Sequence, residues 1–362
     1  MTMAHDQNPV GVKLAGTTND RPREADVAES LQHKAGFSIR DPMGTPIRIP
    51  AAHDEDHAYF SLREAAAIRQ YFDENGYVVI RGLVPGELCD QARMHFDREV
   101  KPFPGHIYRQ TTANPERHAF SDAGLMLNPI LNVQSLDPRS FARFKETGLA
   151  ILTHSGTQQV VRTILEEPGQ IVQSMYFEGN SVTWPHQDTY YIDAEEIGRM
   201  IGAWFAVVDI APGAGRFFIY PKSHRIDLAK NGGNFDIAFN HARYKKLVVD
   251  IIRDHGLQLR APALRKGDVL FWSAKTIHGS LETTQPHLTR SSFTGHYIPR
   301  SLRLLQYQTR VRRLNSMTVN GMEVHRPKDL ARRSRRSIFW VETHYPRTFQ
   351  TVKKLAIKAV TR

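Results

Sequence analysis

The pattern of hydrophobic and polar positions divides the chain into three parts. Residues 1–58 are polar, contain several prolines and show no sustained periodicity, which is typical of a loosely ordered arm with one short helix near residues 24–33. Residues 59–300 carry first helical and then strand-like patterns, so we predict that they form the folded domain. Residues 301–362 follow as a C-terminal extension.

Helical patterns come first in the predicted domain. Ser61 and Glu64 have the spacing of a capped helix start, the next apolar positions fit one helical face, and Gly76 is a typical helix end. The elements predicted after this helix are a strand over 77–80, a helix over 85–96 and a helix over 147–165.

Strand patterns dominate the second half of the predicted domain. The candidate strands are residues 171–177, 201–208, 216–219, 268–272 and 291–297. Short strands separated by Gly and Pro, after a helical portion, predict an α+β fold with a mainly β core. We expect a β-sandwich or jelly roll over about residues 171–298, with helices packed on one side.

Composition narrows the class of protein. With 41% hydrophobic and 23% charged residues, the chain has the composition of an ordinary globular protein. The single cysteine, Cys89, excludes an intrachain disulfide and a cysteine-built zinc site. Because the first 24 residues lack the apolar core of a secretory signal and no stretch approaches roughly 18 apolar residues, we expect a cytoplasmic protein.

The net charge of +11 comes from one end of the chain. Residues 299–362 contain 16 Lys and Arg against 3 Asp and Glu, which leaves 32 against 34 for residues 1–298. The basic character therefore describes the C-terminal extension and not the predicted domain.

Three residues suggest a metal site. His186 and Asp188 are separated by one residue, and His278 follows Asp188 by 90 residues. If the first two lie on a strand, their side chains point to the same face, because strand side chains alternate. Two imidazoles and one carboxylate form the ligand set of a non-haem ferrous site that keeps open coordination positions. At this point iron, zinc and a chance spacing all remain open.

Four sequence motifs, taken together in their order and spacing, narrow these alternatives. They are residues 74–82, 184–188, 215–224 and 267–290. In the order and spacing of these motifs, the chain resembles the phytanoyl-CoA dioxygenase family of iron(II)- and 2-oxoglutarate-dependent oxygenases, from about residue 60 to about residue 300. The resemblance implies a double-stranded β-helix, the cupin-like form of the jelly roll, with flanking α-helices.

The resemblance also implies roles for the three candidate ligands. His186, Asp188 and His278 would bind Fe(II) and carry catalysis, leaving positions for 2-oxoglutarate and O2. Arg290, 12 residues after His278, would meet the distal carboxylate of 2-oxoglutarate with a bidentate guanidinium.

Other family positions match residues around the same co-substrate. Ser280 matches a hydroxyl that shares the distal carboxylate, and Trp204 matches an aromatic wall of the pocket. Gln173, 13 residues before His186, lies on a predicted strand and is a further candidate donor to 2-oxoglutarate. The substrate side is expected to involve the turn-rich segment 100–145. Candidates for substrate contact are Tyr108, Arg109 and His224.

The reaction implied by the resemblance is oxidative decarboxylation of 2-oxoglutarate to succinate and CO2, coupled to oxidation of a small-molecule or carrier-linked metabolite. Related halogenases have a small residue in place of the carboxylate ligand, whereas Asp188 is present here, so hydroxylation of an unactivated C–H bond is expected. Desaturation and ring closure stay open. Two rival classes are a jelly-roll module that binds a metal or ligand without catalysis and a cupin-like zinc hydrolase or isomerase.

The basic extension has an amphipathic character of its own. Arginines cluster at 332–336, and residues 349–362 alternate apolar and cationic positions. Such a helix would bind an anionic lipid surface or dock on the jelly roll or an oligomer partner. Nucleic acid is disfavoured because no motif combines aromatic and basic residues as a base-stacking platform. The extension is also compatible with an anionic substrate.

Overall fold

Eight strands form one mixed sheet in the computed structural model, which describes residues 36–56, 59–228 and 241–360. Neighbouring strands follow the order β16-β17-β7-β13-β9-β11-β3, and β6 also pairs with β7. These strands are β3 (Tyr77–Ile80), β6 (Ile130–Leu131), β7 (Gly169–Phe177), β9 (Ile201–Ala206), β11 (Val269–Ser273), β13 (Ser292–Pro299), β16 (Ser316–Val319) and β17 (Met322–His325). We call this the major sheet.

A smaller group of strands faces the major sheet. β10 (Phe217–Ile219) pairs antiparallel with β12 (His278–Ser280), and isolated bridges join His186 to His278 and Ile219 to Arg260. We call these four segments the minor sheet. The five strands predicted between residues 171 and 297 are present as β7, β9, β10, β11 and β13. Two opposed sheets in this order form a double-stranded β-helix, so the predicted fold class is confirmed.

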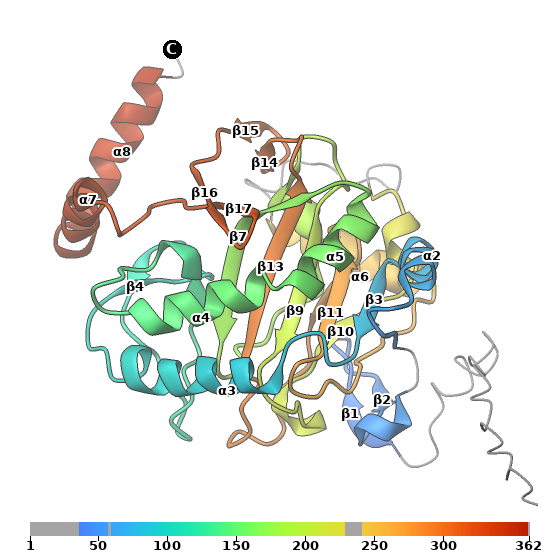
Figure 1. Cartoon of the computed structure of the whole chain (residues 1–362). Coiled ribbons are helices and arrows are strands. Elements are labelled where there is room, and N and C mark those ends of the chain that lie inside the picture. Colours follow the sequence, from blue (N-terminus) through green and yellow to red (C-terminus); the bar gives the residue numbers. More distant parts are fainter. Residues whose placement is uncertain (1–35, 57–58, 229–240, 361–362) are drawn as a thin grey trace, which may run out of the picture.

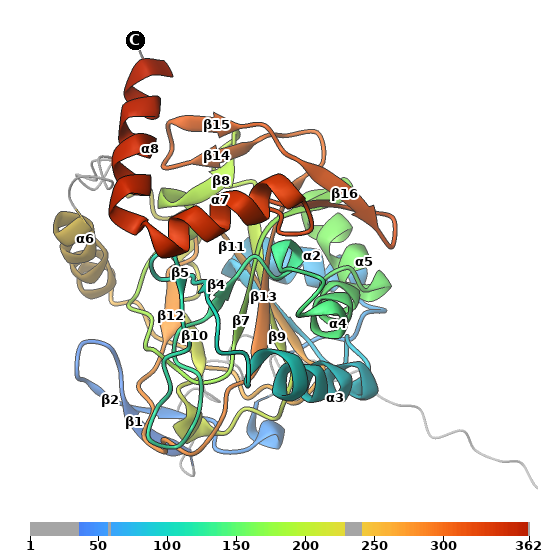
Figure 2. The same cartoon turned by 90° about the vertical axis from the view of Figure 1, so that its left-hand side faces the viewer.

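Four helices cover the outer face of the major sheet. In Figure 1 α3, α4 and α5 cross the front of the sheet, and in Figure 2 they lie on the side away from β10 and β12. The helices are α2 (Ala65–Asn75), α3 (Gly86–His95), α4 (Ala142–Leu152) and α5 (Ser155–Leu165). Aromatic packing joins the layers, since Tyr176 of β7 lies 5.1 Å from Phe144 of α4 and 4.9 Å from Phe293 of β13, measured between ring centroids.

Helix boundaries differ from the sequence prediction at two places. The single helix predicted over 147–165 is wrong, because α4 ends at Leu152 and α5 starts after His154, whose Nδ1 accepts a hydrogen bond from the Gly156 amide. The Glu64 carboxylate does accept the Ser61 amide at 2.8 Å, but this pair closes a turn before α2 begins. Gly76 ends α2 as predicted, with φ of 76°.

Elements outside the jelly roll extend it at both edges. They are β1 (Phe37–Arg40), β2 (Pro46–Ile49), β4 (Ile107–Tyr108), β5 (Pro115–Glu116), β8 (Ile192–Ala194), β14 (Leu304–Gln306), β15 (Arg310–Arg312), α6 (His241–Asp254), α7 (Arg333–His344) and α8 (Pro346–Val360). Within the described ranges, no helix combines the length and apolar character needed to span a bilayer.

The proposed division of the chain near residues 58 and 300 stays a prediction. Segments on both sides of it join the core: β17 pairs in parallel with β7, β14 pairs with β8, and Arg81 of the body bonds to the backbone of Asp56.

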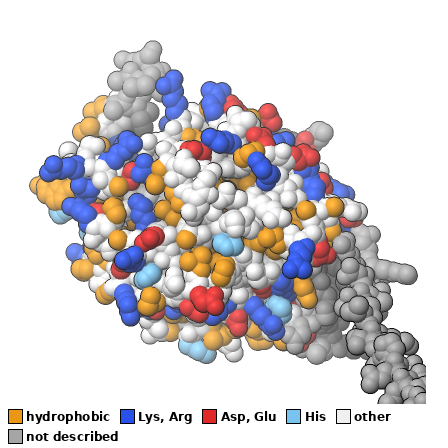
Figure 3. Space-filling model, in the orientation of Figure 1, with side chains coloured by type: hydrophobic (Ala, Val, Ile, Leu, Met, Phe, Trp, Pro, Cys, Tyr) orange, Lys and Arg blue, Asp and Glu red, His pale blue; other side chains and the backbone are white. Residues whose placement is uncertain are grey.

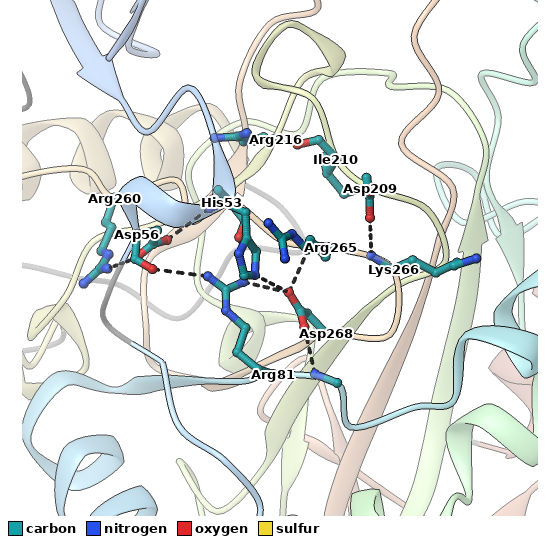
Figure 4. A network of polar contacts seen from close by, with 12 residues as sticks. His53, Asp56, Arg81, Asp209, Ile210, Arg216, Arg260, Arg265, Lys266 and Asp268 are labelled. Atoms are coloured by element: carbon teal, nitrogen blue, oxygen red, sulfur yellow. Dashed lines mark hydrogen bonds and ion pairs between the residues drawn. The ribbon is translucent and has the colours of Figure 1, made fainter. Parts of the chain in front are cut away.

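A buried network of charges ties the segment before residue 58 to the barrel (Figure 4). The Asp268 carboxylate accepts Arg81 at 2.7 Å and the Gly82 amide at 2.8 Å, and His53 Nε2 lies 3.5 Å from it. The Asp56 carboxylate accepts Arg260 at 2.6 Å. Since buried charges are tolerated when they are paired and hydrogen-bonded, this network fixes the position of the N-terminal segment.

Replacing Asp56 tests this connection. We expect Asp56→Ala to lower the free energy of unfolding by about 3–5 kcal/mol at neutral pH, because it leaves the buried Arg260 guanidinium without its carboxylate. Burial acts to raise the pKa of Asp56, but the charges of Arg260 and Arg81 outweigh it, so the pKa lies below its usual range. The stabilisation is therefore present above the unfolded-state pKa, about 3.9, and is lost as the pH falls further. Urea unfolding from neutral pH to below about 3.9 measures the loss of stability and its dependence on pH. Asp122→Ala, at an exposed position, is the control.

Candidate active site

Three side chains from the minor sheet and the turn beside it converge on one point. His186 and His278 exchange backbone hydrogen bonds of 3.0 and 2.9 Å, which places their side chains next to each other. Gln187 is extended, and Asp188 begins the 3-10 helix Asp188–Tyr190. Asp188 therefore does not lie on a strand, but the extended Gln187 still separates two side chains that face the same way. One ligand atom from each of the three residues lies within 4.8 Å of the others.

Backbone carbonyls orient both imidazoles. His186 Nδ1 lies 2.9 Å from the Trp184 carbonyl, and His278 Nδ1 lies 2.9 Å from the Thr276 carbonyl. A ring nitrogen that donates to a carbonyl leaves the other nitrogen as the metal ligand. Both Nε2 atoms face Asp188 Oδ1, at 3.6 and 3.5 Å.

The second oxygen of Asp188 is held from the major sheet. Trp272 of β11 donates its indole N–H to Oδ2 at 2.8 Å, and His296 Nε2 of β13 lies 3.3 Å from the same atom. Burial acts to raise the pKa of Asp188, but His278 and His296 outweigh it, so the pKa lies well below its usual range. The carboxylate is ionised, and Oδ1 is the oxygen turned toward the two histidines.

The position of Trp272 depends on a glycine in the neighbouring strand. Gly202 of β9 is the register partner of Trp272, and a Cβ built on Gly202 would lie 2.2 Å from the indole ring. No side chain fits there without moving the ring. The absence of a side chain at 202 lets the indole lie across β9 and reach Asp188.

Strand β13 carries a polar face that the sequence reasoning missed. Ser292, Thr294 and His296 alternate with Phe293 and other residues of the helix-covered face, and all are buried. His296, which no sequence motif singles out, is one of these residues. Polar residues at every second position of a strand that is buried on both faces indicate a polar site inside the protein. This alternation is the sequence signal that identifies His296 as a site residue.

Arg290 is a buried cation just before β13. Its NH1 donates to the Gly215 carbonyl at 2.9 Å, and its guanidinium lies 5.1 Å from the centre of the Phe177 ring. Its Nε has no hydrogen-bond partner, and no carboxylate lies within 4.0 Å of it, among the residues that the structure describes. Burial lowers the pKa of Arg290 to about 10, so the group remains cationic at neutral pH.

The β10–β12 pair connects Arg290 with the triad. Gly215 leads into β10, where Phe217 lies opposite Ser280, and its ring centre is 5.4 Å from that of His278. Ser280 follows His278 by two residues on the same face of β12, about 7 Å along the strand. This step is comparable with the length of a five-carbon dicarboxylate.

The other predicted co-substrate residues line the same interior. Trp204 is buried on β9, next to Thr294 in register, and its indole N–H has no hydrogen-bond partner within the described ranges. Gln173 of β7 lies opposite His296. The Ser280 hydroxyl donates to Asn180 Oδ1 at 3.0 Å and accepts the Thr183 amide at 2.7 Å. The co-substrate roles of these residues stay predictions.

The three residues predicted to contact the substrate bind other parts of the protein. Tyr108 donates to Glu342 of α7 at 2.5 Å, and Arg109 binds the Asn128 carbonyl at 3.0 Å. His224 packs against the end of α2, where its Nε2 lies 3.2 Å from the Asp73 carbonyl. The structure does not bring these three side chains together with the triad, and their contact with a substrate stays a prediction.

Comparison with known proteins agrees with this geometry. Residues 72–291, more than half of the chain, match the family described as phytanoyl-CoA dioxygenase (PhyH). The chain belongs to the phytanoyl-CoA dioxygenase family. The matched region contains the three candidate metal ligands and Arg290, so the resemblance inferred from four short motifs is confirmed.

Individual members of the family are distant relatives. The chain is 26% identical over 266 residues to zebrafish (Danio rerio) phytanoyl-CoA dioxygenase domain-containing protein 1, covering 63% of this chain and 87% of that protein. It is 22% identical over 269 residues to human peroxisomal phytanoyl-CoA dioxygenase, covering 68% and 72%. The structure of the epimerase SnoN in complex with Fe3+, α-ketoglutarate and nogalamycin RO is similar in fold, with a TM-score of 0.50, 15% identity and coverage of 73% and 95%.

The contact between Trp272 and Asp188 gives a test of the metal centre. We expect Trp272→Phe to weaken binding of a divalent metal by roughly 10–100-fold, because the smaller phenyl ring stays aromatic but lacks the N–H that orients the carboxylate. Calorimetric titration with Co(II) measures the change. Trp340→Phe, at an exposed position on α7, is the matched control. Equal affinity of both variants would show that the indole N–H does not orient Asp188.

Proposed function

We propose that this protein is an iron(II)- and 2-oxoglutarate-dependent dioxygenase that hydroxylates an unactivated C–H bond of a small-molecule or carrier-linked metabolite. Succinate and CO2 are the co-products. Family membership and the donor set of His186, Asp188 and His278 support this class of reaction.

Arg290 is the observation that carries the proposal. A buried guanidinium without a carboxylate partner among the described side chains is costly unless an anion completes it. The free Nε and the planar fork of an arginine suit a carboxylate better than a lysine would. Arg290 contacts the Gly215 carbonyl at the start of β10, and β10 pairs with β12, which carries His278. We propose that 2-oxoglutarate lies along this pair, with its distal carboxylate at Arg290 and its other end at the metal.

The triad fits a metal that needs open coordination positions. Iron(II), when bound, supplies the oxygen chemistry, while the protein contributes position and environment. Trp272 donates a hydrogen bond to Asp188 Oδ2, and His296 Nε2 lies 3.3 Å from the same oxygen, so Oδ1 would be the oxygen left for the metal. His186, Asp188 and His278 would hold the metal and would leave positions for 2-oxoglutarate and O2.

Hydroxylation is the proposed outcome because Asp188 keeps the carboxylate that halogenases of this kind lack. A protein of similar fold is an epimerase, so this scaffold is also compatible with other reactions. The product is therefore to be determined by mass spectrometry, where hydroxylation adds one oxygen atom to the substrate.

Turnover of 2-oxoglutarate tests the reaction class. We expect the protein with ferrous iron and O2 to release succinate from 2-oxoglutarate, and we expect His186→Ala to abolish this release, because one of three metal ligands is lost. The exposed His287→Ala should behave as the unmodified protein. Succinate can be quantified by mass spectrometry with and without a library of metabolites.

Two results would contradict this assignment and point to its rivals. Equal succinate release by His186→Ala and the unmodified protein would mean that the triad is not the catalytic centre. Purified protein that holds zinc and acts without oxygen would indicate a hydrolase or isomerase, and bound iron without any 2-oxoglutarate binding would indicate a non-catalytic module.

Substitution of Arg290 tests the co-substrate site separately from the metal. We expect Arg290→Lys to bind 2-oxoglutarate roughly 10–100-fold more weakly, since it loses a bidentate charge-assisted hydrogen bond, while its affinity for Co(II) is unchanged. Anaerobic titration of the Fe(II) protein, followed by the visible charge-transfer band of the 2-oxoglutarate complex, gives the dissociation constant. Arg300→Lys, at the exposed position after β13, is the control. The same constant for both variants would exclude Arg290 as the carboxylate anchor.

A further inference from the structure

The helices α7 and α8 present an unusual surface at the C-terminal end. Both lie at the edge of the molecule, and α8 projects away from the jelly roll (Figures 1 and 2). We call the exposed side chains of residues 332–355 the hairpin surface. It holds six of the thirteen large hydrophobic side chains that are exposed among the described residues. They are Ile338, Trp340, Val341, Tyr345, Val352 and Leu355, between 38% and 63% exposed.

The opposite face of α7 is already used by the fold. The buried Glu342 accepts the Tyr108 hydroxyl at 2.5 Å and the Lys328 ammonium at 3.5 Å. Phe339 packs edge-on against Tyr108, with ring centres 5.1 Å apart. These contacts fix α7 on the body and leave Trp340 and Tyr345 on the solvent side.

Charge on the hairpin surface has a single sign. Residues 332–355 contain seven Lys and Arg and one acidic residue, the buried Glu342. Arg333, Arg335 and Arg347 are exposed and take part in no ion pair with another described residue. Figure 3 shows basic and hydrophobic side chains next to one another at the left-hand edge, over α7.

A groove beside α7 continues the same mixture of side chains. Its volume is about 820 Å³, and its lining includes Phe103, Trp340, Arg333 and Arg336. Aromatic and cationic groups therefore meet both on the outer surface of α7 and in the groove next to it.

This chemistry selects among possible partners. A symmetric dimer through the hairpin surface would bring the same cationic patch against itself, which is repulsive. Nucleic acid would satisfy the arginines but not the exposed aliphatic side chains. Amphipathic helices with Lys and Arg beside Trp and Leu bind the interface of anionic bilayers. We propose that the hairpin surface docks this protein on membranes that contain anionic phospholipid.

Vesicle binding tests the proposal with the full chain. We expect co-sedimentation with vesicles of phosphatidylcholine and phosphatidylglycerol, little with phosphatidylcholine alone, and weaker binding as salt is raised. Each exposed cation near an anionic surface contributes roughly a fivefold gain in partitioning, so Arg333→Gln, Arg335→Gln and Arg347→Gln together should weaken binding roughly a hundredfold.

A matched variant shows whether vesicle binding depends on where the arginines lie or only on the net charge of the protein. Arg63→Gln, Arg162→Gln and Arg253→Gln remove three exposed arginines from other elements and should leave vesicle binding nearly unchanged. The proposal is overturned if the two triple variants bind alike, if phosphatidylglycerol gives no gain, or if the protein instead binds duplex DNA or dimerises through these arginines without binding vesicles. Succinate release plays no part in this readout, so the result is independent of the proposed reaction.

Tryptophan fluorescence reports the apolar part of the contact. Trp204 and Trp272 are buried, Trp184 is half-buried and Trp340 is 52% exposed. We expect anionic vesicles to shift the emission to shorter wavelength, and we expect Trp340→Phe to remove this shift while vesicle binding persists. A shift that survives Trp340→Phe would place the contact elsewhere.

Discussion

The buried carboxylate of Asp188 joins the two sheets of the jelly roll. One oxygen faces His186 and His278 of the minor sheet, and the other accepts the indole N–H of Trp272 from the major sheet. A buried carboxylate is costly unless charge and hydrogen bonds compensate it. Because the compensating groups come from both sheets, the carboxylate is satisfied only when the two sheets have closed on one another.

Closure also depends on space inside the barrel. Trp272 reaches Asp188 because Gly202 has no side chain. The rings of Trp272, Phe217 and His278 pack against one another, with centres 4.9 to 5.4 Å apart. The rings of Trp272 and Phe217 surround one side of the triad. The other polar groups of the interior, Arg290 Nε and the Trp204 N–H, lack partners among the described residues, which is the condition expected where a polar ligand completes the hydrogen bonding.

Charged residues have opposite roles at the two ends of the described chain. Near the N-terminal end, Asp56 and Asp268 are buried against Arg260 and Arg81, and the charges are used to hold the segment in place. At the C-terminal end, Arg333, Arg335 and Arg347 of the hairpin surface are exposed beside apolar side chains and form no ion pair with another described residue. The first arrangement stabilises the fold, while the second leaves charge available to a partner.

The sequence by itself determined much of this protein. Short strand-like segments separated by Gly and Pro predicted the five strands, because these two residues interrupt regular structure. The spacing of His186, Asp188 and His278 predicted the triad, because two ligands lie two residues apart and the third follows a strand that ends in Trp272. Motifs in a fixed order predicted the family.

Tertiary structure alone decided what surrounds the triad. His296 and Trp272 reach Asp188 from strands more than 80 residues away in sequence, and no local pattern records which residues of two sheets face one another. The break between α4 and α5 was also hidden, because the periodicity of 147–165 continues across His154, and the cap that starts the second helix is a side-chain contact. The sequence fixes local conformation through neighbouring residues, whereas partners across the barrel are chosen when the sheets close.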